Sequence, residues 1–265
     1  MRKLKGRCKA GRGTIPALPF IMKLTDCIYP TQAELFARLR KRYKGRSSFA
    51  KGAFILVRGS SPVMLVAHLD TVHAEGVKTI CTSSDGNILM SPQGIGGDDR
   101  CGVFALVKVY ETAQVKPWLL FTCDEEIGGL GAKKFCIAHE KGKLPDKVDA
   151  LKFIVEIDRR GANDAVYYDC DNPAFKNYIM GKGFKTAHGS FSDISYIAPE
   201  LFTAAVNLSS GYHNPHTLHE FINRSELERT IERVTEMVHD AAREDFPAFV
   251  YIPAQHFGQL DLPLF

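Results

Sequence analysis

Short, wholly apolar segments alternate along the chain with segments in which apolar residues recur at helical spacing. Apolar runs of strand length occupy residues 53–59, 63–70, 118–123, 151–158 and 201–208. Helical spacing marks residues 31–45, 99–113, 130–142, 173–183 and 223–245. Strands that are apolar throughout are typical of a sheet covered by helices on both faces. The pattern therefore predicts an α/β fold.

Local signals refine several of these elements. Thr31 and Asn223 stand where helix caps are expected, and Glu226 follows Asn223 at the spacing of a capping box. A Gly-Ser-Ser-Pro sequence separates residues 53–59 from 63–70 and predicts that these two strands form a hairpin. A weaker strand is expected at residues 165–170.

We expect one folded domain over residues 23–245, because no internal repeat or low-complexity linker divides it. Residues 1–22 form a basic leader that need not be ordered, and residues 246–265 form an extended tail rich in proline and aromatic residues. That tail is expected to lie across the body or against a partner.

Composition removes several classes of function. The net charge of +4 is too small to indicate a nucleic-acid partner. No apolar run approaches the roughly 20 residues of a transmembrane helix, so no membrane association is expected. The cysteines are odd in number, 7, and lack a CxxC pair. They therefore favour a reducing, cytoplasmic location over a disulfide framework, and Cys101 or Cys123 as a catalytic thiol is the weaker alternative.

Histidines and carboxylates follow the predicted strands at the point where each strand ends. The first set is His68 and Asp70, the second is Asp124 to Glu126, and the third is Asp158. A histidine-rich loop, YHNPHTLHEF, follows the last strand, and Asp98 and Asp99 open a helix. Since the carboxyl ends of parallel strands share one edge of a sheet, these side chains should converge.

Each set also has an ordinary structural explanation. Loop carboxylates are mostly solvated, Asp98 and Asp99 would favour the positive end of the helix that follows, and Asp158 could pair with Arg159 or Arg160. Five sets at one location are harder to explain in this way, because histidine and carboxylate are the side chains that hold zinc and related ions.

The spacing within the sets has chemical meaning. Residues two apart on a strand point the same way, so Asp70 can accept the second ring N–H of His68, which orients a metal-binding histidine. The neighbouring side chains of Glu125 and Glu126 diverge. One of them can therefore bind a metal while the other remains free as a base.

The motifs AHLDTV, GGDDRCG, DEEIGG, VEID and PHTLHEF together resemble the co-catalytic zinc exopeptidases, a family that includes tripeptidase, glutamate carboxypeptidase, aminoacylase and the dinuclear zinc aminopeptidases. The resemblance spans residues 63–222. It implies a three-layer sandwich with a mostly parallel, mixed central sheet of the zinc-exopeptidase (phosphorylase/hydrolase-like) type, and two Zn²⁺ ions, with Mn²⁺ or Co²⁺ as alternatives.

The resemblance also implies a role for each residue. His68 and Asp158 resemble ligands of the first metal, and Glu126 resembles a ligand of the second. Asp98 resembles the aspartate that bridges the two metals, and His216 resembles the family's last histidine ligand. Asp99 follows as a second acid, Asp70 orients His68, and Glu125 resembles the general base that acts on a metal-bridging hydroxide. The last histidine stays open between His216 and its rivals His213 and His219. The combined charge of two zinc ions and one hydroxide would nearly balance the negative charge of the three carboxylate ligands.

One departure from the family bears on the substrate. Only 58 residues separate Asp158 from His216 (216 − 158), which leaves no room for the lid domain that helps many relatives bind a substrate carboxylate. Arg159, Arg160 and residues 188–193 are candidates for that task. The expected activity is hydrolysis of an amide bond, by an aminopeptidase or dipeptidase acting on short peptides. The alternatives are an N-acyl amino acid deacylase and an inactive metal-binding scaffold, and the oligomeric state stays open.

Overall fold

The computed structural model describes residues 22–254, and its centre is an eight-stranded sheet in the order β1-β2-β6-β3-β7-β10-β8-β9. Neighbouring strands from β6 to β10 run parallel, whereas β2 and β8 run antiparallel to their neighbours β6 and β10. This mixed sheet confirms the predicted fold class. The strands are β1 Ser47–Ala50, β2 Phe54–Val57, β3 Val63–His68, β6 Trp118–Thr122, β7 Phe153–Arg159, β8 Asp164–Val166, β9 Lys185–Thr186 and β10 Ala205–Ser209.

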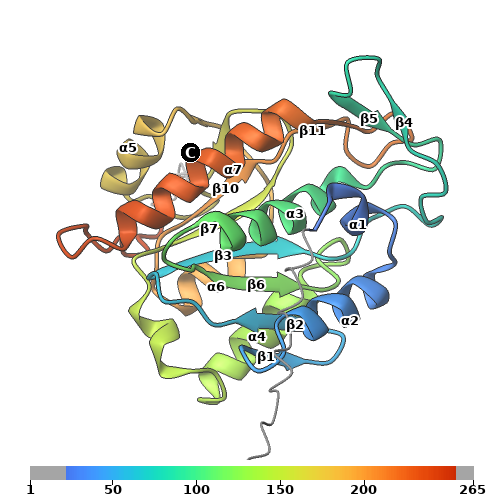
Figure 1. Cartoon of the computed structure of the whole chain (residues 1–265). Helices are drawn as coiled ribbons and strands as arrows, with labels where there is room; N and C mark the ends of the chain where they lie inside the picture. The colour runs from blue at the N-terminus through green and yellow to red at the C-terminus, as the bar shows by residue number, and fades with distance from the viewer. Residues whose placement is uncertain (1–21, 255–265) are drawn as a thin grey trace, which may run out of the picture.

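Helices cover both faces of this sheet and complete three layers (Figure 1). One face carries α1 Leu24–Ile28, α2 Gln32–Arg42, α3 Gly97–Thr112, α5 Pro173–Gly181 and α7 Arg224–Ala241. The other carries α4 Leu130–Glu140, α6 Ile194–Glu200 and the 3₁₀ helix Asp146–Ala150. Within residues 22–254, no helix combines the length and the apolar character needed to cross a bilayer.

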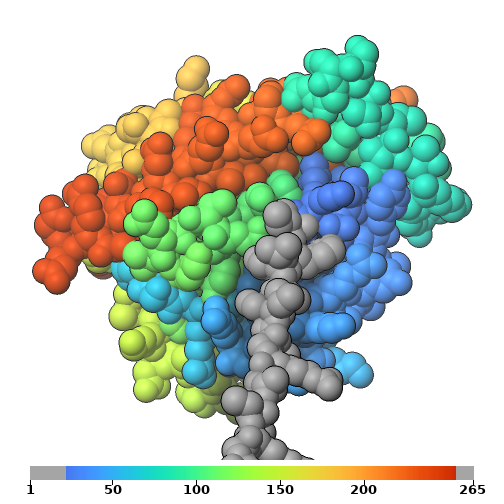
Figure 2. Space-filling model, in the orientation of Figure 1, coloured from blue at the N-terminus to red at the C-terminus, as the bar shows by residue number. Residues whose placement is uncertain are grey.

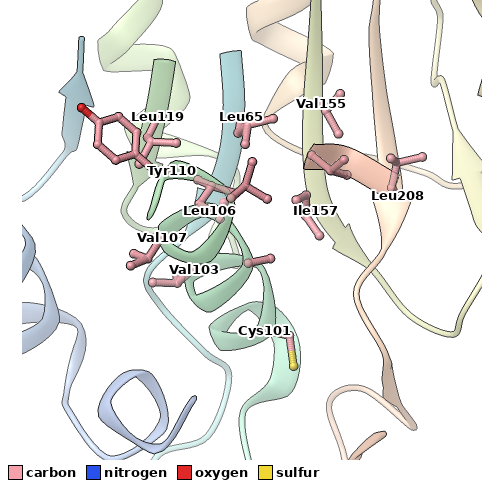
Figure 3. Close-up of a cluster of buried hydrophobic side chains, with 14 of the residues drawn as sticks. Leu65, Cys101, Val103, Leu106, Val107, Tyr110, Leu119, Val155, Ile157 and Leu208 are labelled. Carbon is pink, nitrogen blue, oxygen red and sulfur yellow. The ribbon is translucent and has the colours of Figure 1, made fainter. Parts of the chain in front are cut away.

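The core between α3 and the sheet shows why the strands are apolar on every residue. Leu65 of β3 and Leu119 of β6 point toward α3, whose Leu106 lies between them in Figure 3. Met64 and Val66 of β3 point the other way, toward α4 and α6. Both faces are therefore desolvated, which is the condition that gives a continuous apolar run.

The predicted hairpin of residues 53–70 is wrong. Strand β6 lies between β2 and β3 and pairs with both of them. The intervening turn crosses the start of β6, where the amides of Ser60 and Ser61 donate to the carbonyl of Lys116 at 2.7 and 2.8 Å. All three strands are apolar, so local pattern cannot distinguish a direct pairing from one with a third strand inserted.

A second, smaller sheet was not predicted from the sequence. It has the order β11-β12-β5-β4 and joins residues that lie far apart in the chain. Its hairpin of β4 and β5 projects from the body in Figure 1, and the same segment stands out beside the N-terminal helices in Figure 2. Strands of two or three residues carry too little pattern to be recognised. They are β4 Cys81–Thr82, β5 Ile88–Met90, β11 Tyr212–His213 and β12 Phe221–Asn223.

The predicted helix starts are confirmed. The Thr31 hydroxyl accepts from the amide of Glu34 at 3.3 Å, and the Asn223 side chain accepts from that of Glu226 at 3.4 Å. Two bounds differ from the prediction: α2 ends at Arg42 rather than at residue 45, and β10 begins at Ala205 rather than at residue 201.

The segment after α7 lies across the body. Phe246 and Phe249 are buried against Phe153, and bridges join Thr203 to Val250 and Cys170 to Pro253. Residues 255–265 of the predicted tail, and residues 1–21 of the predicted leader, lie outside the described residues.

His139 of α4 lies between two carboxylates, and this geometry makes stability depend on pH. Its Nδ1 is 2.6 Å from Glu200 and its Nε2 is 2.7 Å from Asp149. Partial burial opposes the charge of the imidazole, but the two hydrogen bonds outweigh it and raise the pKa of His139 above its ordinary value. The charged imidazole donates to both carboxylates, whereas a neutral one can donate to only one.

We therefore expect His139→Gln to lower the free energy of unfolding by about 0.5 to 1 kcal/mol at about pH 6 and by much less near pH 9. The stabilisation is complete below the ordinary histidine pKa of about 6.5 and is lost as pH rises through the raised value. Urea unfolding of both proteins at the two pH values measures this difference. An equal difference at both would contradict it.

Candidate functional site

The carboxyl ends of β3, β6 and β7 bring the predicted residues together at one edge of the sheet. Strands β3 and β6 are parallel, and their arrows in Figure 1 point toward the side on which α1 and the β4–β5 hairpin lie. His68 ends β3 opposite Thr122 of β6, while Asp158 lies near the end of β7. The expected convergence therefore occurs.

Three groups of donor atoms form at this edge among the described residues, and Asp98 belongs to two of them. The first group is His68, Asp98 and Asp158, and the second is Asp98, Glu126 and His216. His68 Nε2 lies 3.1 Å from Asp98 Oδ1 and 3.5 Å from Asp158 Oδ1. His216 Nε2 lies 3.3 Å from both Asp98 Oδ2 and Glu126 Oε1. The two oxygens of Asp98 thus face different histidines.

These separations fit metal ligands. Two atoms that each lie about 2.1 Å from a tetrahedral Zn²⁺ ion are about 3.4 Å apart. Buried carboxylate oxygens normally receive hydrogen bonds, yet Glu126 Oε1 and Asp158 Oδ1 have no hydrogen-bond partner. Imidazole and carboxylate are also the donors that zinc, manganese and cobalt accept. The residues present therefore fit two divalent cations that share Asp98.

The electrostatics favour positive charge at the same place. Burial raises the pKa of Asp158 well above its ordinary value, and the charge of Asp98 raises it further. Burial and then Asp98 also raise the pKa of Glu126. Burial opposes the charged form of His68, but Asp158 and other carboxylates outweigh it and raise that pKa well above its ordinary value. A hydrogen bond to Asp98 raises the pKa of His216 to about 9. Negative charge is thus crowded at this edge.

Asp70 connects the first group to the loop that follows β6. Its Oδ1 lies 3.2 Å from His68 Nδ1, as the spacing of the two residues predicted. The same carboxylate also accepts from the amides of Glu125, at 3.1 Å, and Glu126, at 3.0 Å. This second contact was not predicted. It means that one side chain fixes both the ring of His68 and the position of the two glutamates.

Asp124, the first acid of the triplet, points elsewhere. It has a left-handed backbone, with φ of 60°, and its Oδ1 accepts from Gln32 Nε2 at 2.9 Å. Its amide in turn donates to Gln32 Oε1 at 3.2 Å. This turn separates Asp124 from Glu125 and Glu126 and explains how three consecutive acids fit at a strand end.

Glu125 lies directly beside the two donor groups. Its carboxylate, His68 and Glu126 offer atoms within 4.8 Å of one another. Burial raises the pKa of Glu125 to about 7, and the charges of Asp193 and Glu126 add to the rise. A carboxylate with a pKa near neutrality can accept a proton and return it.

Asp99 has a supporting role in the structure. It is fully buried. Its carboxylate accepts hydrogen bonds from the amide of Gly102 at 2.9 Å and from the amide of His68 at 3.3 Å. The Asp98–Asp99 peptide bond is cis. A Cβ on Gly102 would lie 2.2 Å from the carbonyl oxygen of Ile157, so only glycine lets α3 start this close to β7. Asp99 thus ties the start of α3 to β3, and Asp98 is left facing the donor atoms.

Among the three loop histidines, only His216 lies in a donor group. His213 Nε2 is 2.6 Å from Glu226, and its ring stacks on Phe221 at a centroid distance of 4.7 Å. His219 belongs to none of the groups formed by the described residues. The geometry therefore favours His216 over both rivals.

Glu220 is a site residue that the sequence reasoning missed. It is fully buried, and its two oxygens accept from the amides of Gly96 and Asp98, each at 2.9 Å. His73 Nε2 lies 2.9 Å from the same carboxylate. Its sequence position, next to β12, gave no sign of contacts with residues more than 120 positions away. Glu220 holds the backbone of Asp98 in place.

We expect Glu220→Gln to weaken both folding and metal binding. The amide keeps one acceptor oxygen, so one of the two backbone N–H groups loses its partner in a buried position. That loss should lower the free energy of unfolding by about 1 to 3 kcal/mol and weaken metal binding about ten- to a hundredfold. Denaturant unfolding and zinc titration measure the two effects. Glu232→Gln, at an exposed position of α7, is the control, and equal metal affinity in both variants would count against the role of Glu220.

Four buried polar residues lie near Glu125: Thr122, Glu156, Ser192 and Asp193. The Thr122 hydroxyl donates to Asp193, and the Ser192 hydroxyl donates to Glu156. These two bonds attach the end of the predicted substrate loop, residues 188–193, to the sheet. Burial raises the pKa of Asp193 to about 6 and that of Glu156 well above its ordinary value.

Of the two arginines considered from the sequence, Arg159 contacts the loop of residues 188–193. Arg159 Nη2 donates to the carbonyl oxygen of His188 at 3.1 Å, and its Nε lies 3.7 Å from Asp164 Oδ2. Asp158 Oδ1 lies 3.5 Å from His68 Nε2. Arg159 instead contacts the loop of residues 188–193 and Asp164.

The two candidate thiols lack the features of a nucleophile. Cys101 and Cys123 are both buried. Burial raises the pKa of Cys123 to about 12 and raises that of Cys101 well above its ordinary value. A nucleophilic cysteine requires a lowered pKa, so neither fits that role.

Comparison with known proteins supports the fold. No protein-family model matches the chain, and no curated protein matches it by sequence. A tripeptidase from Staphylococcus aureus superposes with a TM-score of 0.63 at 14% identity, over 83% of this chain and 97% of that one. The aminopeptidase PepT from Bacillus cereus gives 0.62 and 14% over 83% and 97%. The TET1 peptidase of Pyrococcus horikoshii gives 0.56 and 12% over 82% and 99%. The chain has the fold of these peptidases.

Proposed function

We propose that this chain is a metal-dependent hydrolase of amide bonds, an aminopeptidase or dipeptidase that acts on short peptides. One observation carries the proposal. The two oxygens of Asp98 face two separate histidine and carboxylate groups at ligand-like spacing, with Glu125 beside them. The fold shared with a tripeptidase and with aminopeptidases supports the same reaction class.

Two Zn²⁺ ions are the proposed cofactors, and Mn²⁺ or Co²⁺ suit the same donors. His68, Asp98 and Asp158 would hold one ion, and Asp98, Glu126 and His216 the other. When bound, a pair of divalent cations supplies Lewis acidity to water and to a substrate carbonyl.

Glu125 is the proposed general base. It accepts a proton from the attacking water as the new C–O bond forms, and it passes that proton to the amine nitrogen as the C–N bond breaks. Asp70 holds the catalytic groups in position, because it accepts from the amides of Glu125 and Glu126 while it orients His68. His216 is half exposed, so the substrate reaches the centre from its side.

Two other functions fit the chain less well. An N-acyl amino acid deacylase must hold a free carboxylate on the leaving amino acid, and so must a dipeptidase. The described side chains that line the cavity beside His216 include no lysine or arginine, which favours an aminopeptidase over both. An inactive scaffold has no use for a buried base, yet Glu125 lies next to the donor groups.

Elemental analysis of the purified protein, together with a substrate panel, tests the proposal. Aminoacyl anilides and dipeptides are compared with N-acyl amino acids in the presence of each candidate metal. Hydrolysis of the first set with two metal ions per chain supports an aminopeptidase. Hydrolysis confined to the second set would assign a deacylase, and absence of both would leave only the scaffold.

A further inference from the structure

A second cavity, of about 250 Å³, lies between the turn that joins α1 to α2 and the loops of residues 70–77 and 94–96. Arg100, in the first part of α3, also lines it. The volume is below the range of about 300–1,000 Å³ that is usual for drug-sized ligands, but far above the roughly 10–15 Å³ that one water molecule requires. The cavity therefore suits a small ligand such as an inorganic ion.

Arg100 is a buried charge without an ion pair. Its side chain is only 4% exposed, and within residues 22–254 no carboxylate forms an ion pair with it. Burial lowers the pKa of Arg100 to about 10, and the nearby charges of Asp70 and Asp99 offset only part of this effect. The guanidinium thus stays charged at neutral pH. A buried charge is costly unless a partner of opposite charge compensates it.

The hydrogen bonds of Arg100 leave one edge of the guanidinium free. Nη1 donates to the carbonyls of Cys27 at 2.8 Å and Pro30 at 2.9 Å, which uses both of its N–H groups. Nε is buried and has no acceptor, and Nη2 forms no hydrogen bond with any other described residue. Nε and Nη2 lie on the same edge of the planar group. Two parallel N–H donors of this kind match two oxygens of one oxyanion.

The other ionisable side chains that line the cavity already have partners. Asp70 accepts from two backbone amides. His73 lies 2.9 Å from Glu220, and Glu75 lies 2.7 Å from Lys78. Among the described residues that line the cavity, the unused binding capacity is therefore that of a cation with two aligned donors.

We infer that this cavity binds a free inorganic oxyanion of sulfate or phosphate size, held by the Nε and Nη2 edge of Arg100. A halide ion cannot bridge the two donors with two separate acceptor atoms, so it should bind less tightly. None of the five proposed metal ligands lines the cavity, and the site does not depend on the proposed function. A bound oxyanion would supply the missing counter-charge and stabilise the folded chain.

Isothermal titration calorimetry of the metal-loaded full chain with sodium sulfate tests the inference, because sulfate coordinates zinc more weakly than phosphate does. The wild type should bind one sulfate per chain, and chloride at least about tenfold more weakly. Gly76→Asp places a negative charge on the cavity wall and should weaken sulfate binding by about tenfold or more. A Cβ at this position meets no atom within 4 Å, so Gly76→Asn is a matched neutral control that should bind sulfate like the wild type.

Arg100→Lys provides a second test, because it keeps the charge but removes the pair of aligned donors. It should weaken sulfate binding about tenfold, and urea unfolding shows whether the variant is folded. Absence of sulfate binding in the wild type would overturn the inference, and so would equal affinities of Gly76→Asp and Gly76→Asn. Sulfate binding that is lost on removal of the metals but unchanged in Gly76→Asp would place the anion at the metal positions instead.

Discussion

Replacing Glu125 with glutamine is expected to lower kcat for peptide hydrolysis by about a thousandfold, within the range of roughly 10² to 10⁴ found for general acid–base groups. Glutamine has nearly the same shape but cannot take a proton from water. Glu125 is not assigned to either proposed metal position, so the variant should still bind two ions per chain. Steady-state kinetics and elemental analysis measure the two quantities separately.

The neighbouring acid provides a matched control. Asp124 belongs to the same loop but is hydrogen-bonded to Gln32. Asp124→Asn should therefore retain most of the wild-type kcat. If Glu125→Gln hydrolyses every substrate at the wild-type rate while binding its metals, Glu125 is not the base. If it loses its metals, its carboxylate is a ligand instead.

Asp98→Ala is expected to have the other large effect, because it removes a donor atom from both proposed metal positions at once. The metal content should fall from two ions per chain to fewer than one, and kcat/KM should fall on the order of a thousandfold or more, without recovery in excess zinc. Elemental analysis after gel filtration and peptide hydrolysis assays measure these effects.

Loss of a ligand must be distinguished from loss of the fold. Circular dichroism of Asp98→Ala should match that of the wild type, and Glu228→Ala, at an exposed position of α7, should retain both metal and activity. Two tightly bound ions in folded Asp98→Ala would refute the shared position of this carboxylate.

The parts of the fold that could be predicted are those recorded in local pattern. The apolar strands are set by burial, and the start of α7 is set by its cap Asn223. Both effects act within a few residues. The order of the strands depends on pairings between distant segments. The insertion of β6 between β2 and β3 left no local trace, so the predicted hairpin was wrong.

The same distinction applies to the site. His68, Asp98, Glu126, Asp158 and His216 could be proposed because each follows a strand or opens a helix. The contacts of Glu220 with Gly96 and Asp98, and of Asp70 with two backbone amides, could not. Every residue except proline has a backbone N–H group, so a carboxylate that accepts from backbone amides does not require a particular residue type at the donor position. The sequence at that position therefore does not indicate the contact.

The dependence of Asp98 on Glu220 has a consequence for the order in which the molecule is assembled. The donor atoms come from residues 68 to 216, and the carboxylate that holds Asp98 comes at residue 220. In a growing chain, the proposed ion-binding site would therefore be complete only after β12 has paired with β5. Binding of the proposed metal ions would then occur only after folding is complete. Ions that bind the folded protein and not the unfolded chain would stabilise it against unfolding.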